Sequence, residues 1–165
     1  DIAFLSPDRA AVVTYDGDVW LADGLKGDAL RQVVWHRFAS GLHESLALAT
    51  VHGVIQVATK NGLVRLHDRD GNGEADWYEN FSDAMRQSQS TRTFPLDMDI
   101  GPDGSTFVSA GGIALGGAGT PFAGGIARIS PDGNTAELIS IGAREPYVTV
   151  HPRTGMLTGT DQQGN

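Results

Sequence analysis

The stretch LALATVHGVIQVATKNGLVRL, residues 46–66, decides the fold class. Apolar residues alternate with small or polar ones on both sides of His52-Gly53, a pair typical of a tight hairpin turn. The same order of strand, turn and strand recurs at residues 2–24, 97–112 and 148–164. The sequence therefore predicts an all-β chain built from a repeated hairpin.

The hairpin turns are evenly spaced. Gly53 and Gly104 are 51 residues apart, and so are Gly104 and Gly155. Outer strands are expected between the hairpins, over residues 19–22, 62–66, 125–129 and 136–141. Four short strands in a repeat of about 50 residues are typical of a β-propeller blade, which buries its faces only against neighbouring blades.

The repeat predicts about three and a half blades, over residues 1–40, 41–92, 93–141 and, as the start of a further blade, 142–165. Propellers close with about four to eight blades. We therefore expect a fragment, or one chain of an interrupted propeller, whose remaining blades come from the same or another chain. The alternative is a small, self-contained β-sandwich.

The composition indicates an acidic, turn-rich domain. The 165 residues carry a formal net charge of −8, with a pI of about 4.9, and include 22 glycines and 7 prolines. Nucleic acid is not an expected partner, because a phosphate backbone would be repelled. The sequence has no cysteine and no apolar stretch long enough for a membrane span. Because it begins with Asp1, we expect a mature or internal segment.

Much of the negative charge lies in residues 68–79, DRDGNGEADWYE. Oxygen donors at alternating positions, with Gly73 at the sharp turn, match the calcium loop of EF-hand proteins. The predicted calcium ligands are Asp68, Asp70, Asn72, Glu74 through its backbone carbonyl, Asp76 and Glu79. A strand is expected before the loop and a short helix over residues 77–86 after it. The alternative is an Asp- and Gly-rich surface turn without an ion.

Two stretches resemble the glucose/sorbosone dehydrogenase-like β-propellers of bacteria. Residues 41–82, from GLHES to WYENFS, are similar to the Gly-Leu-His-Glu-Pro strand and acidic loop of that family. Residues 142–165, GAREPYVTVHPRTGMLTGTDQQGN, are similar to its Gly-x-Arg-Asn-Pro strand and Asp-Asn-Gln-Gly turn. The resemblance covers the chain after about residue 35 and implies part of a six-bladed propeller that is periplasmic or extracellular.

The resemblance also implies a cofactor site. In quinoprotein sugar dehydrogenases of this fold, the arginine of the Gly-x-Arg-Asn-Pro motif contacts pyrroloquinoline quinone. It matches Arg144 here, and Asp161 and Gln162 in the second motif are the further cofactor-binding candidates. A guanidinium suits this task because it binds carboxylates and keeps its charge. The alternative is that Arg144 pairs with Glu145 or with a neighbouring blade.

The catalytic base of those enzymes is absent from its expected position. Counting from the Gly-Pro-Asp-Gly turn places Thr93 where they have a histidine, and a hydroxyl is a poor base near neutral pH. His43 lies two repeats before Arg144 and is a possible substitute. The candidate catalytic residues are therefore His43, Asp97 and Arg144, with a structural histidine as the alternative for His43.

The leading functional hypothesis is a calcium-binding module of a secreted sugar or polyol dehydrogenase-like protein that uses pyrroloquinoline quinone. Its electrons would leave through a haem c domain or partner. The alternative is a non-catalytic propeller that binds carbohydrate or protein and holds calcium as a scaffold. A calcium-dependent hydrolase ranks third, because a tunnel ion needs ligands from several blades and the acidic residues here are consecutive.

Overall fold

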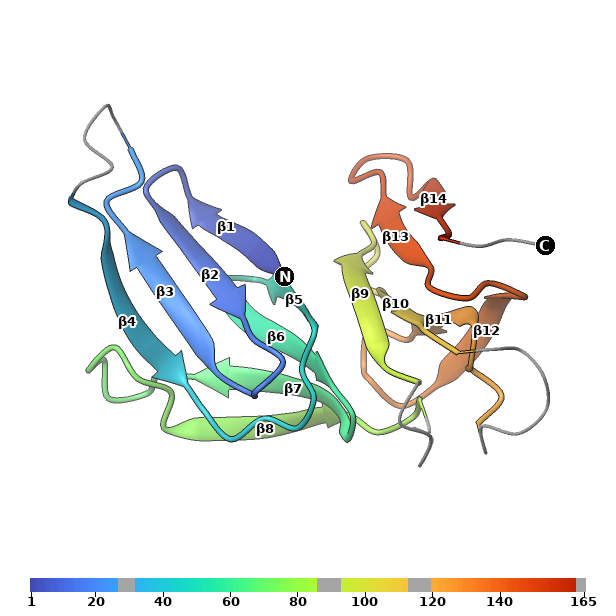
Figure 1. Cartoon of the computed structure of the whole chain (residues 1–165), viewed down its shortest axis with the longest axis horizontal. Helices are drawn as coiled ribbons and strands as arrows, with labels where there is room; N and C mark the ends of the chain where they lie inside the picture. The colour runs from blue at the N-terminus through green and yellow to red at the C-terminus, as the bar shows by residue number, and fades with distance from the viewer. Residues whose placement is uncertain (27–31, 86–92, 113–119, 163–165) are drawn as a thin grey trace.

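The structure is a computed structural model that describes residues 1–26, 32–85, 93–112 and 120–162. Over these residues the chain forms four antiparallel sheets in chain order (Figure 1). The first sheet contains β1 (Ile2–Ser6), β2 (Arg9–Val13), β3 (Val19–Asp23) and β4 (Val34–Ala39). The second contains β5 (Ala47–Val51), β6 (Val54–Thr59), β7 (Gly62–His67) and β8 (Trp77–Ser82). The third contains β9 (Pro95–Ile100), β10 (Thr106–Ala110), β11 (Gly125–Ile129) and β12 (Ala136–Ile141), and the fourth contains β13 (Tyr147–Val150) and β14 (Leu157–Thr160).

Each of the first three sheets is a meander in which every strand pairs with the strand before and after it. The all-β class and the predicted hairpins are confirmed. His52 and Gly53 form the turn between β5 and β6, and the residues around Gly104 and Gly155 connect the first two strands of the third and fourth sheets. No helix in the described ranges is long and apolar enough to cross a membrane.

The predicted helix over residues 77–86 is wrong. Trp77–Ser82 forms the strand β8, which pairs antiparallel with β7 in a register that places Leu66 opposite Tyr78. Residues 86–92 lie outside the described ranges. Pairing with β7 holds this stretch extended, so the tertiary context decides between strand and helix.

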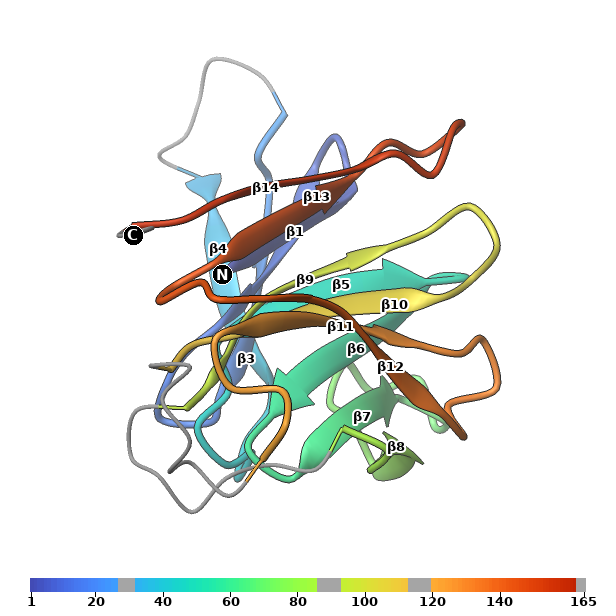
Figure 2. The same ribbon diagram turned by 90° about the vertical axis from the view of Figure 1, so that its right-hand side faces the viewer.

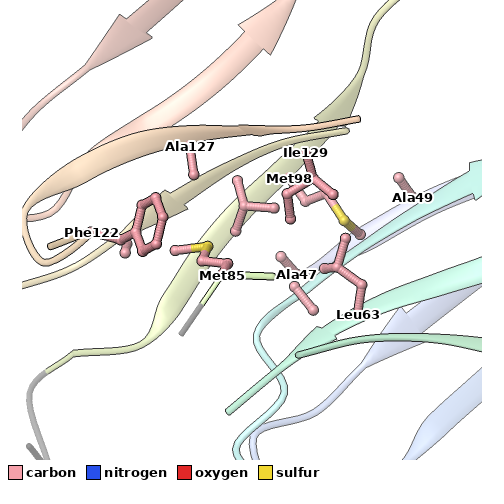
Figure 3. Close-up of a cluster of buried hydrophobic side chains, with 11 residues drawn as sticks. Ala47, Ala49, Leu63, Met85, Met98, Phe122, Ala127 and Ile129 are labelled. Atoms are coloured by element: carbon pink, nitrogen blue, oxygen red, sulfur yellow. The ribbon is translucent and has the colours of Figure 1, made fainter. Parts of the chain in front are cut away.

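Each sheet contacts the next sheet in the chain through its first strand. β1 contacts β5, β5 contacts β9, and β9 contacts β13. Figure 1 shows the sheets in this order, and Figure 2 looks along it, with β13 in front of β1. One apolar core joins the first and second sheets, with Val19, Leu48 and Val57 among its buried members. A second core joins the second and third sheets around Leu63 and Ile129 (Figure 3). Neighbouring sheets therefore bury their faces against each other.

Two polar contacts reinforce the packing of the third sheet on the second. The fully buried Gln56 donates through Nε2 to the Thr106 hydroxyl at 3.0 Å and accepts from Arg65 Nε at 3.0 Å. The Ser82 hydroxyl donates to the Gly133 carbonyl at 2.6 Å. Gly133 lies in the turn between β11 and β12 with φ of 76°, and a side chain there would collide with the backbone of β8.

Candidate functional site

The acidic loop, residues 68–76, connects β7 to β8 and lies against the outer strand of the first sheet. The Ala75 N–H donates to the Phe38 carbonyl at 2.7 Å. The hydroxyl of Tyr78, at the start of β8, accepts the Ser40 N–H at 3.0 Å and donates to the Ser40 carbonyl at 3.1 Å. A groove of about 730 Å³ lies between the loop and the strands β3 and β4. The loop thus bridges two sheets.

The loop curls around the carboxylate of its first residue, Asp68. Asp68 Oδ1 accepts the N–H groups of Gly71 at 2.8 Å and Asn72 at 3.1 Å, and Oδ2 accepts the Gly73 N–H at 2.9 Å. Gly73 has φ of 93°, a conformation that favours glycine. The chain reverses here because main-chain donors converge on one side chain.

Asp70 and Asn72 continue this turn. The Asn72 side-chain amide donates to Asp70 Oδ2 at 3.0 Å, and the Asn72 N–H donates to Asp70 Oδ1 at 3.2 Å. Asn72 Oδ1 accepts the Glu74 N–H at 2.8 Å. The structure therefore brings together the predicted ligands at positions 68, 70 and 72.

Asp76 and Glu79 have other partners. Arg69 Nε lies 2.9 Å from Asp76 Oδ1, and this hydrogen bond lowers the pKa of the Asp76 carboxyl. Glu79 lies on β8, where its Oε2 is 2.7 Å from His67 Nε2. The last two predicted ligands are thus oriented toward basic side chains rather than toward Asp68.

The donor chemistry of the loop suits calcium, which takes about six to eight oxygen ligands. In the described part of the chain, however, no group of three or more His, Asp or Glu side chains is arranged to hold a metal ion. Asp68, Asp70 and Asn72 already share one turn. To join them, Asp76 would have to leave Arg69, and Glu79 would have to leave His67.

A second polar region lies where the first strands of the four sheets meet. A cavity of about 340 Å³ is lined by residues of β1, β5, β9 and β13, together with Asp1. Its acidic side chains are Asp1, Asp97 and Asp99. A neighbouring cavity of about 250 Å³ adds Leu46 and Tyr147 to its lining. Of the predicted catalytic and cofactor residues, Asp97 is the one named in the lining of these two cavities.

Asp97, a predicted catalytic residue, bridges the third and fourth sheets. Its Oδ1 accepts the N–H of the next residue, Met98, at 2.9 Å, and its Oδ2 accepts the Val148 N–H at 2.8 Å. Asp99 repeats the arrangement with the N–H groups of Ile100 at 2.8 Å and Val150 at 2.7 Å. These carboxylates satisfy main-chain donors at the open edge of β13, which is a structural task.

Arg144, Asp161 and Gln162, the predicted cofactor-binding residues, lie together. The Asp161 carboxylate accepts the Arg144 N–H at 3.1 Å, the Glu145 N–H at 2.8 Å and the Gln162 N–H at 3.0 Å. These main-chain donors, led by Glu145, lower the pKa of Asp161. Asp161 therefore holds the turn before β13, with Arg144 on the surface.

His43 lies apart from that group. Its side chain is 56% exposed, with Nδ1 3.4 Å from Asn61 Oδ1 and Nε2 3.8 Å from Glu44 Oε1. Both of these partners belong to the second sheet and the segment before it, whereas Arg144 precedes the fourth sheet. Within the described ranges, no hydrogen bond or ion pair joins His43 to Arg144, Asp97 or Asp161.

Sequence reasoning missed the ion pair beside His43. Glu44 Oε2 lies 3.3 Å from Lys60 Nζ, and Lys60, only 9% exposed, also lies 4.7 Å from the centre of the Phe94 ring. Glu44 has φ of 47°, an uncommon conformation for a residue with a side chain. Lys60 follows a strand like many surface lysines, so nothing in the sequence marks it as buried.

Thr93, at the position where the motif resemblance predicts a histidine, is 1% exposed. Among the residues that the structure describes, its buried hydroxyl has no hydrogen-bond partner. It is therefore placed in the interior, next to Gly112. The glycine-rich segment after Gly112 falls largely on residues 113–119, outside the described ranges.

The chain was also compared with known proteins. No protein-family model matches it, and no curated protein matches it either. Proposals about its function therefore rest on its own residues and on the motif resemblance described above.

Proposed function

We propose that this chain is a calcium-binding module of a β-propeller, in which the acidic loop fastens the second sheet to the first. The propeller arrangement is supported by four consecutive sheets whose first strands line one cavity. The remaining blades would come from the same or another chain. A calcium ion between Asp68, Asp70 and Asn72 would neutralise a loop whose carboxylates otherwise repel each other.

The observation that carries the calcium proposal is the convergence of three oxygen-bearing side chains in a loop that is already docked on a neighbouring sheet. An ion that binds only the folded state raises the unfolding transition. Melting curves in millimolar calcium and in excess chelator test this proposal. Calcium should raise the transition temperature, and chelator should reverse the rise; identical curves in both buffers would rule the ion out.

We further propose that the propeller belongs to an exported sugar or polyol dehydrogenase-like protein, located in the periplasm or outside the cell. Bound pyrroloquinoline quinone would be the electron acceptor of the reaction, and a haem c domain or partner would then accept the electrons from it. The Arg144 guanidinium would bind a cofactor carboxylate, next to Asp161 and Gln162. Asp161 supports this role by fixing the backbone of Arg144.

His43 is the proposed proton acceptor, and Asp97, which lines the cavity between the first strands of the sheets, is the other proposed catalytic carboxylate. An exposed imidazole beside a carboxylate can accept a proton from a sugar hydroxyl. The Lys60 ammonium lies 3.3 Å from the other carboxylate oxygen of Glu44, and this ion pair would hold Glu44 beside His43. Arg144 and His43 would have to reach the same ligand from different sheets.

A non-catalytic propeller that binds carbohydrate or protein is the second candidate. The observation that favours it is the buried Thr93 at the position where the motif resemblance predicts a catalytic histidine. Titration with pyrroloquinoline quinone and calcium, followed by dye reduction with a panel of aldoses, separates the two. Reduction that is lost in Arg144→Ala supports the enzyme, whereas sugar binding without reduction supports the binding module.

A further inference from the structure

One face of the first sheet is apolar and open to solvent. Cross-strand partners point to the same side of a sheet. Two rows of such partners cross the four strands of this face, Phe4-Ala10-Ala22-Trp35 and Ile2-Val12-Trp20-Arg37. The alternate residues Ala11 and Leu21 pack toward the second sheet, so these rows point away from it.

The large side chains of this face are exposed to an unusual degree. Ile2 is 54% exposed, Phe4 67% and Trp35 54%. The two alanines between Phe4 and Trp35 are buried. An exposed apolar patch that spans a whole sheet marks a contact surface rather than a scatter of single residues.

The matching rows of the later sheets are covered by the sheet that precedes them in the chain. In the second sheet the rows are Thr50-Ile55-Leu66-Tyr78 and Leu48-Val57-Val64-Asn80. Of these, Leu48, Ile55, Val57 and Leu66 are buried in the core shared with the first sheet. In the third sheet the rows are Ile100-Thr106-Ile129-Ala136 and Met98-Val108-Ala127-Leu138. Met98, Val108, Ala127 and Ile129 are buried in the core shared with the second sheet.

We propose that the exposed face of the first sheet receives a further four-stranded antiparallel sheet of the same repeat, formed by residues that precede Asp1 in the same polypeptide. Sheets that are consecutive in sequence pack against each other, as the first and second do and as the second and third do. In both pairs the later sheet turns the same face toward the sheet before it. The exposed face of the first sheet corresponds to the face that the second and third sheets bury against the preceding sheet. The proposal rests on the propeller arrangement proposed above, but it requires neither calcium nor a cofactor.

The residues expected on the contact face of this additional sheet can be inferred from the faces by which the first and second sheets contact the sheet that follows them. The second sheet offers Ala47, Ala49, Ala58 and Leu63 to the third sheet (Figure 3). The first sheet offers Ala11, Val13, Val19 and Leu21 to the second. We therefore expect small and aliphatic residues opposite Phe4, Trp20 and Trp35, since the aromatic rings already fill much of the space between two sheets.

Thiol labelling tests this proposal, because the chain contains no cysteine and one introduced thiol reports one position. Phe4→Cys places the thiol on the exposed face. Val34→Cys is the control, on β4 with its side chain on the opposite face and 62% exposed. In the 165-residue chain both thiols should react with a maleimide at similar rates.

In the polypeptide that includes the preceding residues, labelling of Phe4→Cys should slow by about 100-fold or more, because it then requires local opening. Val34→Cys should remain reactive. Trp35→Cys, at the other end of the same row, serves as a second variant if Phe4→Cys does not fold. Labelling in calcium-free buffer keeps the result separate from the calcium proposal.

Three results would overturn the proposal. Unchanged reactivity of Phe4→Cys in the longer polypeptide would show that the face stays open. Protection that appears in the 165-residue chain and grows with its concentration would assign the face to a second copy. A natural polypeptide that begins at Asp1 would leave no preceding sheet to cover it.

Discussion

The carboxylate of Asp97 accepts the main-chain N–H of Val148 at 2.8 Å, across 51 residues of sequence. The same bond joins Asp99 to Val150, again across 51 residues, and Asp1 to Leu48 at 3.0 Å. In each case the other carboxylate oxygen accepts the N–H of the residue that follows the aspartate. In the described residues strands pair within each sheet, and these aspartates link the first strands of neighbouring sheets through their side chains.

Removal of this link should destabilise the junction between the third and fourth sheets. Asp97→Ala leaves the N–H groups of Met98 and Val148 without their acceptor, so we expect a loss of about 1–3 kcal/mol in the free energy of unfolding. Asp97→Asn keeps one acceptor oxygen and should lose less. Urea denaturation measures both; an unfolding midpoint for Asp97→Ala equal to that of the wild type would contradict the structural role of Asp97.

The buried amide of Gln56 should be equally sensitive. Gln56→Leu keeps the approximate volume but leaves Arg65 and Thr106 without their partners, which should cost about 1–3 kcal/mol of folding free energy. Gln162→Leu is the matched control at an exposed position and should change stability by less than about 0.5 kcal/mol. Equal effects of the two substitutions in thermal or urea unfolding would argue against the Gln56 network.

The contact between the acidic loop and the first sheet can be tested by a substitution at Tyr78. Tyr78→Phe removes only the hydroxyl that bonds the backbone of Ser40, so the expected loss is about 0.5–1.5 kcal/mol of stability. The matched control is Tyr147→Phe, at a tyrosine that is 52% exposed. Hydrogen exchange should also become faster for the amides of Ser40 and Ala75; unchanged exchange there would show that the loop is held in another way.

The turn between β11 and β12 predicts a response to acid. The Ser130 hydroxyl, 2.6 Å from Asp132 Oδ1, and then the Asn134 N–H lower the pKa of Asp132 to about 2. Because the pKa of Asp132 is lower in the folded state, its stabilising contribution is complete above the unfolded pKa of about 3.9 and is lost as the pH falls through about 2. NMR titration should show that Ser130→Ala raises this pKa; an unchanged value would remove the hydroxyl as its cause.

The repeated hairpins could be predicted from sequence because each turn has its own local chemistry. His52-Gly53 and the Gly-Pro-Asp-Gly sequence at Gly101–Gly104 each predict a hairpin turn. The spacing of 51 residues between them aligns the strands that flank the two turns. The strand β8 was missed because its residues also suit a short helix. Pairing with β7 and the contact of Tyr78 with Ser40 decide its conformation, and neither is a local property.

The candidate site was predictable where its residues share one turn or flank one hairpin, as Arg144 and Asp161 flank β13 and β14. Asp68, Asp70 and Asn72 come together because they share one turn. The roles of Asp97 and of the Glu44–Lys60 pair depend on contacts between different sheets or loops, which composition and spacing do not reveal. Asp97 shows the difference: the repeat predicts its position near the start of an inner strand, whereas its bond to Val148 depends on how the third and fourth sheets pack.

Calcium binding to the acidic loop is the central claim, and isothermal titration calorimetry of calcium into the chelator-stripped chain tests it most directly. We expect one ion per chain, with an affinity that falls at least about tenfold in Asp70→Asn, because that variant keeps one acceptor oxygen for Asn72 and loses one ligand charge. Asp16→Asn, in the turn between β2 and β3, should bind calcium like the wild type. No binding heat at millimolar calcium, or equal affinities for wild type and Asp70→Asn, would contradict the claim.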